Sequence, residues 1–294
     1  MGWDTPGPSS RTRRPLSGVD HASPAAEAAR PRDRVAPVAS DADLAVDAAV
    51  IVVVSAAIAL RPESVALMTA LVSTLILARM IAWTWVRRAT GREVAGETLF
   101  VLLCTGLGGF NDWASVVHHR IYDYTVPHYV TWSTIPVWML LFWGLILRTL
   151  ATLARWRRLD PPIRPSDVVR IGRRCAHHPW LRVAALVALV LATRQTIYRF
   201  YADPWLSWLP FAGAAALYAL VFGFDRHDRR LALAILVGGP LIEILYIQVG
   251  GLHRYHLGWL GGVPLWIALW WVVALVVWKD LSARILAVLG PARR

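Results

Sequence analysis

Two acidic residues, Asp112 and Glu243, lie inside otherwise apolar segments of this chain. A charged side chain is costly in a hydrocarbon core, so such residues normally face the interior of a helix bundle. An apolar environment favours the protonated form of a carboxyl, which is how proteins make a general acid. Both residues are therefore candidate catalytic groups. The alternative is a structural role, in which each carboxyl bonds Arg194, Arg199 or a tyrosine and locks the bundle.

The two acids lie in segments that resemble each other. The first reads GGFNDWASVVHHRIYDYT and then IPVWMLLFWG, and the second reads GGPLIEILYIQVGGLHRYH and then VPLWIALWWV. Aligned residue by residue, the positions that match are Gly108, Asp112, Tyr124, Pro136, Trp138 and Trp143 with Gly239, Glu243, Tyr255, Pro264, Trp266 and Trp271. This shared register predicts an internal duplication. Interfacial anchoring by tryptophan is an alternative reason for the P-x-W-x4-W pattern, but it does not explain the paired acids.

Tyrosines and histidines follow both acids. The matched residues Tyr124 and Tyr255 are candidates to orient water or to accept the last proton of a reaction. His119 lies seven residues, two helical turns, beyond Asp112, so we expect these two side chains to share one helix face. A cluster of histidines and carboxylates can bind a metal. The sequence contains no H-E-x-x-H and no comparable histidine box, so we expect neither a metal site nor a cofactor.

Aromatic side chains are the third candidate group, because their ring faces can stabilise a carbocation. Packing and an interfacial aromatic belt are the alternative explanation for the tryptophans. The residues expected to bind substrate are Asn111, Trp113, Trp138, Trp143, Trp266 and Trp271.

The composition is that of a chain surrounded mostly by lipid. Hydrophobic residues make up 56% of the 294 residues, charged residues make up 17%, and mean hydropathy is +0.47. Soluble domains are about 45–50% apolar and about 25% charged. The shift argues against a soluble enzyme, a disordered chain and a disulfide scaffold. Cys104 and Cys175 form no C-x-x-C, which indicates neither a redox motif nor a thiolate metal site.

Eight apolar stretches are expected to cross the membrane as helices. They lie at about 44–60, 64–86, 97–118, 130–154, 181–198, 205–223, 231–250 and 260–279. The expected fold is an all-α polytopic transmembrane helix bundle. It has a disordered basic tail over 1–42, four-helix repeats over 43–158 and 181–294, and a basic cytoplasmic loop over 159–180. Repeats with an even number of helices have the same orientation, which implies a pseudo-two-fold axis along the membrane normal.

The basic residues predict the orientation. With eight spans, 24 of the 31 Lys and Arg fall on the side that holds both termini and 5 fall on the other side. By the positive-inside rule both termini are cytoplasmic and the chain is integral to the inner membrane. Arg79 and Arg148 fall within spans, in their cytoplasmic halves, where we expect them to snorkel. The net charge of +12 is thus explained by membrane lipid as partner, without nucleic acid. The sequence does not indicate an oligomeric state.

The second copy resembles the core of a known family. Glu243, then Gly250, Tyr255 and GGVPLWIALWW are similar to the integral-membrane carotenoid biosynthesis family, the type that includes bisanhydrobacterioruberin hydratases. In that family an intramembrane Glu is followed by a Gly, a Tyr-x-Tyr and a Gly-Val-Pro-Leu helix start that ends in Trp. The IYDYT of the first copy is similar to this Tyr-x-Tyr, whereas Asp112 and the single Tyr255 depart from the pattern. The resemblance implies an apolar isoprenoid-like substrate, converted inside the membrane without a cofactor.

Two classes of function remain open. The first is an enzyme that hydrates or cyclises a lipid-soluble polyene, with Asp112 or Glu243 as the acid. The second is a proton-coupled transporter or a lipid-binding or scaffold protein. Transporter sites favour helices that are interrupted near the midplane. The glycines around 106–109 and the Gly-Gly-Pro at 238–240 keep that alternative open.

Overall fold

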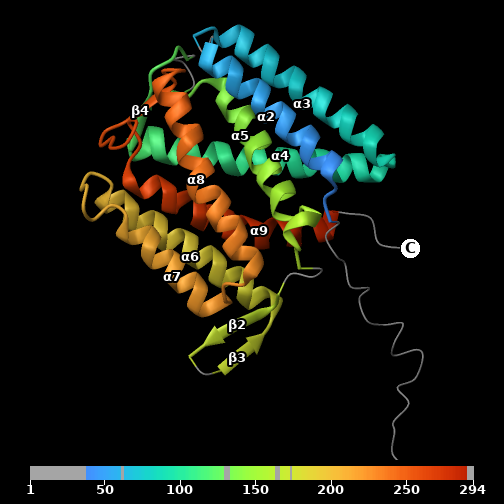
Figure 1. The fold of residues 1–294 in the computed structure, drawn as a ribbon, viewed down its shortest axis with the longest axis vertical. Helices are drawn as coiled ribbons and strands as arrows, with labels where there is room; N and C mark the ends of the chain where they lie inside the picture. The colour runs from blue at the N-terminus through green and yellow to red at the C-terminus, as the bar shows by residue number, and fades with distance from the viewer. Residues whose placement is uncertain (1–37, 61–62, 129–132, 163–165, 173, 290–294) are drawn as a thin grey trace, which may run out of the picture. The chain divides into compact units, whose positions relative to one another are not determined.

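The apolar stretches fold as helices, since a helix satisfies its own backbone groups. The computed structural model describes residues 38–60, 63–128, 133–162, 166–172 and 174–289, and these are mostly helical (Figure 1). The helices within them are α2 (Asp41–Leu60), α3 (Val65–Arg87), α4 (Gly91–Trp113), α5 (Val137–Ala154), α6 (Pro179–Phe200), α7 (Leu209–Phe222), α8 (Arg226–Gln248) and α9 (Leu265–Leu289). The predicted helical bundle is confirmed. Of the tail predicted over 1–42, residues 1–37 lie outside the described residues.

Six helices among the described residues are long and apolar enough to cross a membrane. They are α2, α3, α4 with its continuation to His118, α5, α6 and α8. The sixth predicted span is the shorter helix α7, whose 14 residues rise about 21 Å. That is less than the roughly 30 Å of a hydrocarbon core. The last predicted span, α9, is 25 residues long and has a largely buried surface.

Capping residues and prolines set several helix ends. Thr90 with Glu93 forms a capping box at the start of α4, and Asp225 with Asp228 forms one at the start of α8. Pro136 directly precedes α5, and Pro264 directly precedes α9. Proline lacks a backbone N–H and fits the start of a helix. The fourth helix therefore begins at Val137, later than the expected residue 130.

Two short antiparallel ladders join segments outside the helices. β1 (Tyr122–Tyr124) pairs with β4 (His253–Tyr255), and β2 (Val168–Ile171) pairs with β3 (Arg174–His177). The β2–β3 hairpin lies within the segment expected to be a loop over 159–180. The two strands of this basic segment pair through backbone hydrogen bonds, with Val168 opposite His177 and Ile171 opposite Arg174.

The helices pack in two corresponding groups. α4 packs on α5, α8 packs on α9, and α5 and α9 contact each other. α2 and α3 lie beside each other and contact α5, whereas α6 and α7 lie beside each other and contact α9 (Figure 1). One apolar core includes residues of α6, α7 and α9, and the other includes residues of α2, α3 and α5. α5 and α9 thus form the shared centre of the bundle.

A buried ion-pair network lies between α2, α3, α4 and α5. Arg79 and Arg148 are only 2% and 4% exposed, so the expected snorkelling is wrong. Nε of Arg79 lies 2.8 Å from Oδ1 of Asp47, and Nε of Arg148 lies 2.5 Å from Oε1 of Glu97. Arg79 also pairs with Glu97, and Thr152 donates to Asp47 at 2.5 Å. Two acids that the sequence analysis did not single out hold both guanidinium groups inside the bundle.

This network predicts a large loss of stability on removing one cation. Arg148→Met leaves Glu97 buried without one of its two guanidinium partners and should lower the free energy of unfolding by about 3–5 kcal/mol. Thermal unfolding of the purified protein in detergent measures the loss. Arg92→Met is the matched control, because Arg92 is exposed at the start of α4. Equal unfolding temperatures of the two variants would contradict a stabilising network.

Candidate functional site

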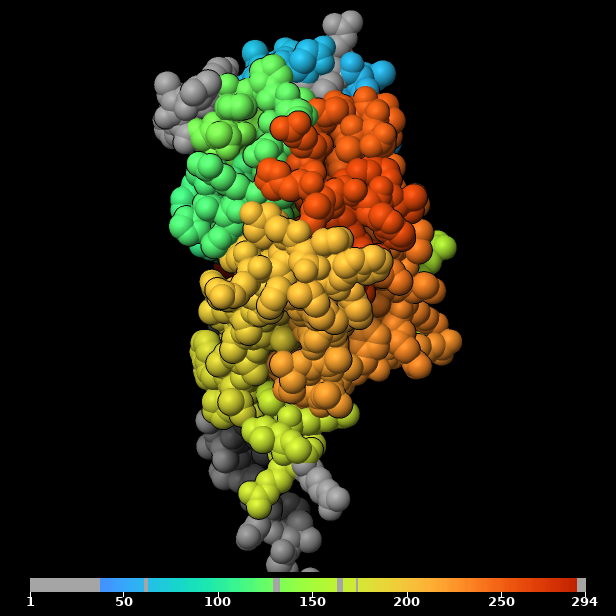
Figure 2. Space-filling view, turned by 90° about the vertical axis from the view of Figure 1, so that its left-hand side faces the viewer, coloured from blue at the N-terminus to red at the C-terminus, as the bar shows by residue number. Residues whose placement is uncertain are grey.

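The β1–β4 ladder brings the two acid-bearing segments together. Its register pairs Tyr122 with Tyr255, Asp123 with Arg254 and Tyr124 with His253. In the alignment of the two copies Tyr124 corresponds to Tyr255, and the residues two positions earlier, Tyr122 and His253, therefore also correspond. Tyr122 thus pairs with the counterpart of Tyr124, and Tyr124 pairs with the counterpart of Tyr122. The central residue, Asp123, pairs with its own counterpart Arg254. Figure 2 shows the green residues that follow α4 beside the red-orange residues that follow α8, above the yellow α6–α7 pair.

Asp112 is enclosed by the two tyrosines of β1. Its side chain is fully buried, with 0% exposure. Tyr122 donates a hydrogen bond to Oδ1, and Tyr124 donates one to Oδ2 at 2.8 Å. Burial, together with the neighbouring Asp112 carboxyl, raises the pKa of both phenols well above their ordinary value, so both remain donors. Asp112 therefore has the tyrosine partners expected if its role is to stabilise the bundle.

Glu243 has a different environment from its counterpart. Its Oε2 lies 3.0 Å from Nε2 of His253 and 3.5 Å from the hydroxyl of Tyr255. Burial raises the pKa of Tyr255 well above its ordinary value, so this phenol is protonated. The rings of Tyr122, Tyr124, His253 and Tyr255 contact one another at centroid distances of 5.2–6.0 Å. The carboxyl of Glu243, the imidazole of His253 and the phenol of Tyr255 therefore form a group that can hold and move a proton.

The carboxyl of Glu243 also lines a cavity of about 290 Å³, here named the Glu243 cavity. Its walls come mainly from α5 and α8 and are mostly apolar. The polar groups at one end are those of the ring cluster. Trp143 and Trp271 form part of its wall. Asp112 does not line this cavity, whereas Tyr122 and Tyr124, which donate hydrogen bonds to its carboxyl, do.

A second cavity of about 530 Å³, here named the Arg194 cavity, lies between α4, α6 and α9. Trp143 and Trp271 line this cavity as well, so the two indoles form a wall common to both. The linings use matching positions of the two copies. These are Trp143, Ile146, Thr149, Leu150 and Leu153 on α5 for the first cavity, and Trp271, Ala274, Val277, Trp278 and Leu281 on α9 for the second.

The structure separates some of the predicted site residues from the acids. His119 stacks on Tyr198 with a centroid distance of 3.4 Å and lines the Arg194 cavity. Its expected helix face with Asp112 is not formed, because the chain leaves α-helical geometry in a π-helical turn over Ala114–His118. Asn111 also lines the Arg194 cavity and accepts a hydrogen bond from Arg194 at 2.7 Å.

The predicted tryptophans fall into four environments. Trp143 and Trp271 line both cavities, as a substrate wall would. Trp138 is fully buried in the core and lines neither cavity. Trp113 is 44% exposed and stacks on His118, and it contributes to the Arg194 cavity. Trp266 is buried edge-on against Tyr255, behind the ring cluster.

Two residues of the cluster were not among the predicted catalytic set, namely Tyr122 and His253. Their signal was in the aligned copies, since Y-x-Y in the first copy corresponds to H-x-Y in the second. From the sequence alone, the missing tyrosine was only a departure from the family pattern. In the structure that position carries the imidazole nearest to Glu243. Within the described residues no group of three or more His, Cys, Asp or Glu side chains is arranged to hold a metal ion.

The glycines of both copies bring helices into close contact and do not interrupt them. α4 and α8 each run unbroken through these positions. A Cβ atom at Gly108 would lie 2.6 Å from Cβ of Trp143, and one at Gly239 would lie 2.5 Å from Cδ1 of Trp271. The same glycine-to-tryptophan contact therefore occurs in both copies. The broken helices typical of transporter sites are not present at these two places.

The chain matches no protein-family model, and no curated protein or solved structure is similar to it. The chemistry available at the site follows from its own residues. It combines a carboxyl beside an imidazole, protonated phenols, an apolar cavity and indole faces along the cavity wall. Such a set can donate a proton and hold a cation away from bulk water.

The glycine contacts predict a position-specific effect of adding one methyl group. Gly108→Ala and Gly239→Ala should each destabilise the protein by about 1–3 kcal/mol, because the tryptophan must shift. Gly106→Ala and Gly238→Ala are matched controls on the same helices, since a Cβ at either position meets nothing within 4 Å. These controls should be neutral or stabilising by up to about 1 kcal/mol. Thermal unfolding in detergent compares the four, and equal effects at all positions would contradict the close contacts.

Proposed function

We propose that this chain is an integral-membrane enzyme that adds a proton to a carbon–carbon double bond of a lipid-soluble isoprenoid or polyene. Hydration or cyclisation of the substrate follows from that protonation. The observation that carries the proposal is the carboxyl of Glu243, which faces an apolar cavity while it contacts His253 and Tyr255. Acid-initiated alkene chemistry requires this combination of a proton donor and a dry pocket.

The proton comes from the neutral carboxyl of Glu243. It forms a new C–H bond at one alkene carbon and leaves a carbocation at the other, with Glu243 as the carboxylate. In hydration a water oxygen bonds to the cation and gives up one proton, which returns to Glu243 through His253. Nε2 of His253 is 3.0 Å from Glu243, within range of this return. The balance is alkene plus water to alcohol. In cyclisation an internal alkene replaces water, and the final proton leaves from carbon.

The cation requires a wall that attracts positive charge without reacting with it. Indole and phenol ring faces do this through their quadrupoles, at about 2 kcal/mol or more when desolvated. Trp143 and Trp271 line the Glu243 cavity, and Tyr122 and Tyr124 line its polar end. Asp112 is then a positioning residue, because it accepts hydrogen bonds from both of these tyrosines. The two acids of the repeat would thus have different tasks.

The substrate class rests on two observations. The wall of the Glu243 cavity is mostly apolar, which suits a hydrocarbon chain. The second copy also resembles the integral-membrane carotenoid biosynthesis family through Glu243, Gly250, Tyr255 and GGVPLWIALWW. His253 occupies the position where that family has the first tyrosine of its Tyr-x-Tyr. This difference is compatible with an acid that is reprotonated by an imidazole.

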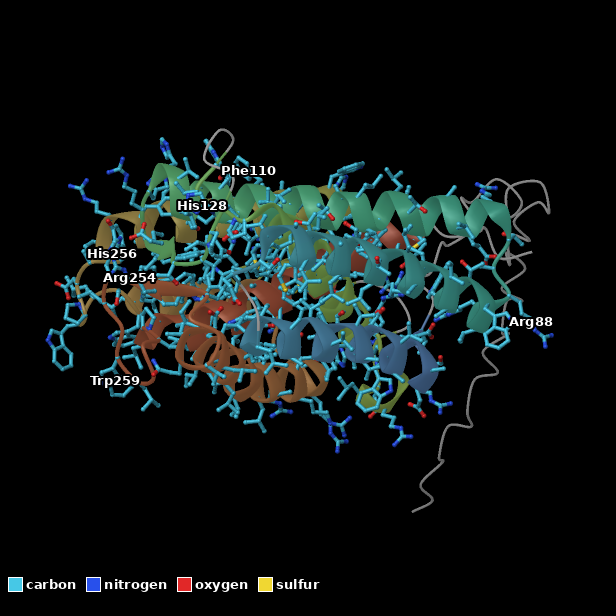
Figure 3. All side chains as sticks on the ribbon, turned by 90° about the horizontal axis from the view of Figure 1, so that it is seen from above. Arg88, Phe110, His128, Arg254, His256 and Trp259 are labelled. Atoms are coloured by element: carbon cyan, nitrogen blue, oxygen red, sulfur yellow. The ribbon has the colours of Figure 1, made fainter. Side chains whose placement is uncertain are left out.

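The topology belongs to the same proposal. The chain is integral to the inner membrane, with eight spans in two parallel repeats and both termini cytoplasmic. The matched contacts of Gly108 with Trp143 and Gly239 with Trp271 support the repeat, as do the paired tyrosine–acid contacts. Figure 3 has Arg88 at one end of the bundle and Arg254, His256 and Trp259 at the opposite end, in agreement with the expected sidedness.

Proton-coupled transport is the second candidate, and one observation favours it. The ion-pair network of Asp47, Glu97, Arg79 and Arg148 supplies ionisable groups inside the bundle in addition to the acids of the ring cluster. A transporter would use such groups as a relay across the membrane. Purified protein in liposomes distinguishes the candidates, because a transporter would acidify or alkalinise the lumen when its solute is added, and the enzyme would not.

The topology predicts the result of reporter fusions. Reporters fused after residues 90, 165 and 228 should be cytoplasmic, and those fused after 125 and 254 should be external, because the basic residues concentrate on the first side. Alkaline phosphatase and green fluorescent protein fusions measure this directly. An external signal at 165 would contradict the topology, since the segment between α5 and α6 is rich in arginine.

The proposed chemistry predicts separate effects for the two acids. In cells that synthesise an acyclic C40 polyene, the chain should yield a product heavier by one water, or an isomer of equal mass. Glu243→Gln should lower product formation by at least about 100-fold, because an amide cannot donate the proton. Asp112→Asn should retain measurable turnover with lower thermal stability. Mass spectrometry of extracted lipids reads the product.

Asp123→Asn is the control for these variants, since Asp123 lies in β1 between the two tyrosines and its side chain is 45% exposed. It should produce wild-type amounts of product. Full product from folded Glu243→Gln would contradict the proposed acid. Lumenal pH changes without any new lipid product would favour transport.

A further inference from the structure

We infer that the Arg194 cavity is a second binding site, for a single-chain amphiphile whose anionic head group pairs with Arg194. This inference does not depend on the alkene chemistry proposed for Glu243. It concerns a different cavity, between α4, α6 and α9, and a different charge. The shared ligand chemistry is one carboxylate or phosphate group on a long apolar chain.

Arg194 is a cation inside a membrane-spanning helix with no acidic partner among the described residues. Its Nη1 donates to Oδ1 of Asn111 at 2.7 Å, and its Nε donates to the hydroxyl of Tyr198 at 2.7 Å. Both partners are neutral, so the positive charge is held in place without being neutralised. Three buried arginines of these helices, Arg79, Arg148 and Arg182, each pair with at least one carboxylate. An unneutralised intramembrane cation marks a ligand or ion pathway.

The cavity beside this cation is long and apolar. Its volume is about 530 Å³, within the range of roughly 300–1,000 Å³ that small-molecule sites occupy. The polar side chains of its lining come from the end of α4 with its continuation and from α6, namely Asn111, His118, His119, Thr193, Gln195 and Tyr198 together with Arg194. Most of the other lining residues are apolar, and those on α9 extend from Trp270 to Leu281, roughly 16 Å of helix. A ligand with one polar end and a long apolar tail fits this separation of polar and apolar lining.

The cavity has a route to lipid. Leu107 and Phe110 on α4 are 44% and 62% exposed, and Leu191 on α6 is 55% exposed, yet all three belong to its lining. The opening between α4 and α6 is thus bordered by apolar side chains. A membrane amphiphile would enter laterally with its chain among these residues.

The internal repeat explains how two cavities of opposite character arose. Their linings on α5 and α9 use matching positions, but the ionisable groups differ. The first cavity contains Glu243, whereas its counterpart Asp112 is closed off by Tyr122 and Tyr124. The second cavity contains Arg194, which also lines a smaller cavity of about 50 Å³ together with Glu243. One cavity therefore suits a neutral hydrocarbon and a proton donor, and the other suits an anion with an apolar chain.

Binding of two tritiated probes to the full chain tests the inference. The probes are palmitate and farnesyl phosphate, measured by scintillation proximity with the protein in neutral detergent. Both should bind, and Arg194→Met should weaken binding by at least about tenfold through loss of a charge-assisted contact. Ala274→Phe should weaken it as well, because the ring fills the apolar part. Arg199→Met is the matched control on the same helix and should bind as wild type, since Arg199 is exposed and does not line the cavity.

Competition on the unmodified protein keeps the test decisive if Arg194→Met fails to fold. Unlabelled hexadecanol has the chain without the charge, and inorganic phosphate has the charge without the chain. Neither should displace the probes. Binding of palmitate alone, or of farnesyl phosphate alone, would support the site and identify the head group. Displacement by hexadecanol would overturn the role of Arg194, displacement by inorganic phosphate would overturn the amphiphile, and wild-type binding by folded Arg194→Met would overturn both.

Discussion

A carboxyl held away from water needs hydrogen-bond donors or a cation, and this requirement arranges the polar residues of the bundle. Asp112 has two phenols, Asp47 and Glu97 have two guanidinium groups, and Glu243 has an imidazole and a phenol. The donors for Asp112 come from a short strand beyond the helix that carries the acid. The β1–β4 ladder is thus needed to place them, which explains an extended segment at the end of a helical bundle.

The close approach of helices within each copy depends on glycine. Gly108 and Gly239 leave room for Trp143 and Trp271, whose indoles then form the wall of both cavities. Two apolar helices can pack at several distances from each other. The glycine–tryptophan contacts fix the distance between the two helices of each pair. The position of the acids relative to the aromatic wall follows from that separation, since Asp112 and Glu243 each lie one turn beyond the glycine.

The features predicted from the sequence were those with a long or repeated signal. Apolar runs located the helices, and the register of Gly108, Asp112 and Tyr124 with Gly239, Glu243 and Tyr255 located contacts that the structure has in both copies. Single residues were harder to assign.

His253 was overlooked because its importance depends on the β1–β4 ladder. Strands of three residues are too short to be recognised in a helical sequence. Asp47 and Glu97 were overlooked because each lies in the second turn of its helix and follows acids of the first turn, where acidic residues are common. Only their meeting with Arg79 and Arg148 from other helices gives them a shared environment.

Trp143 and Trp271 have a consequence for how the sequence can vary over evolution. Because each indole borders both cavities, a smaller side chain at either position would enlarge two spaces at once. The proposed duplication would leave the two halves free to diverge, each according to its own task. The common wall, which also includes Leu150, limits that freedom, so adaptation of one cavity must proceed through residues that the other does not share. Glu243, which lines the first of these cavities, and Arg194, which lines the second, are such residues.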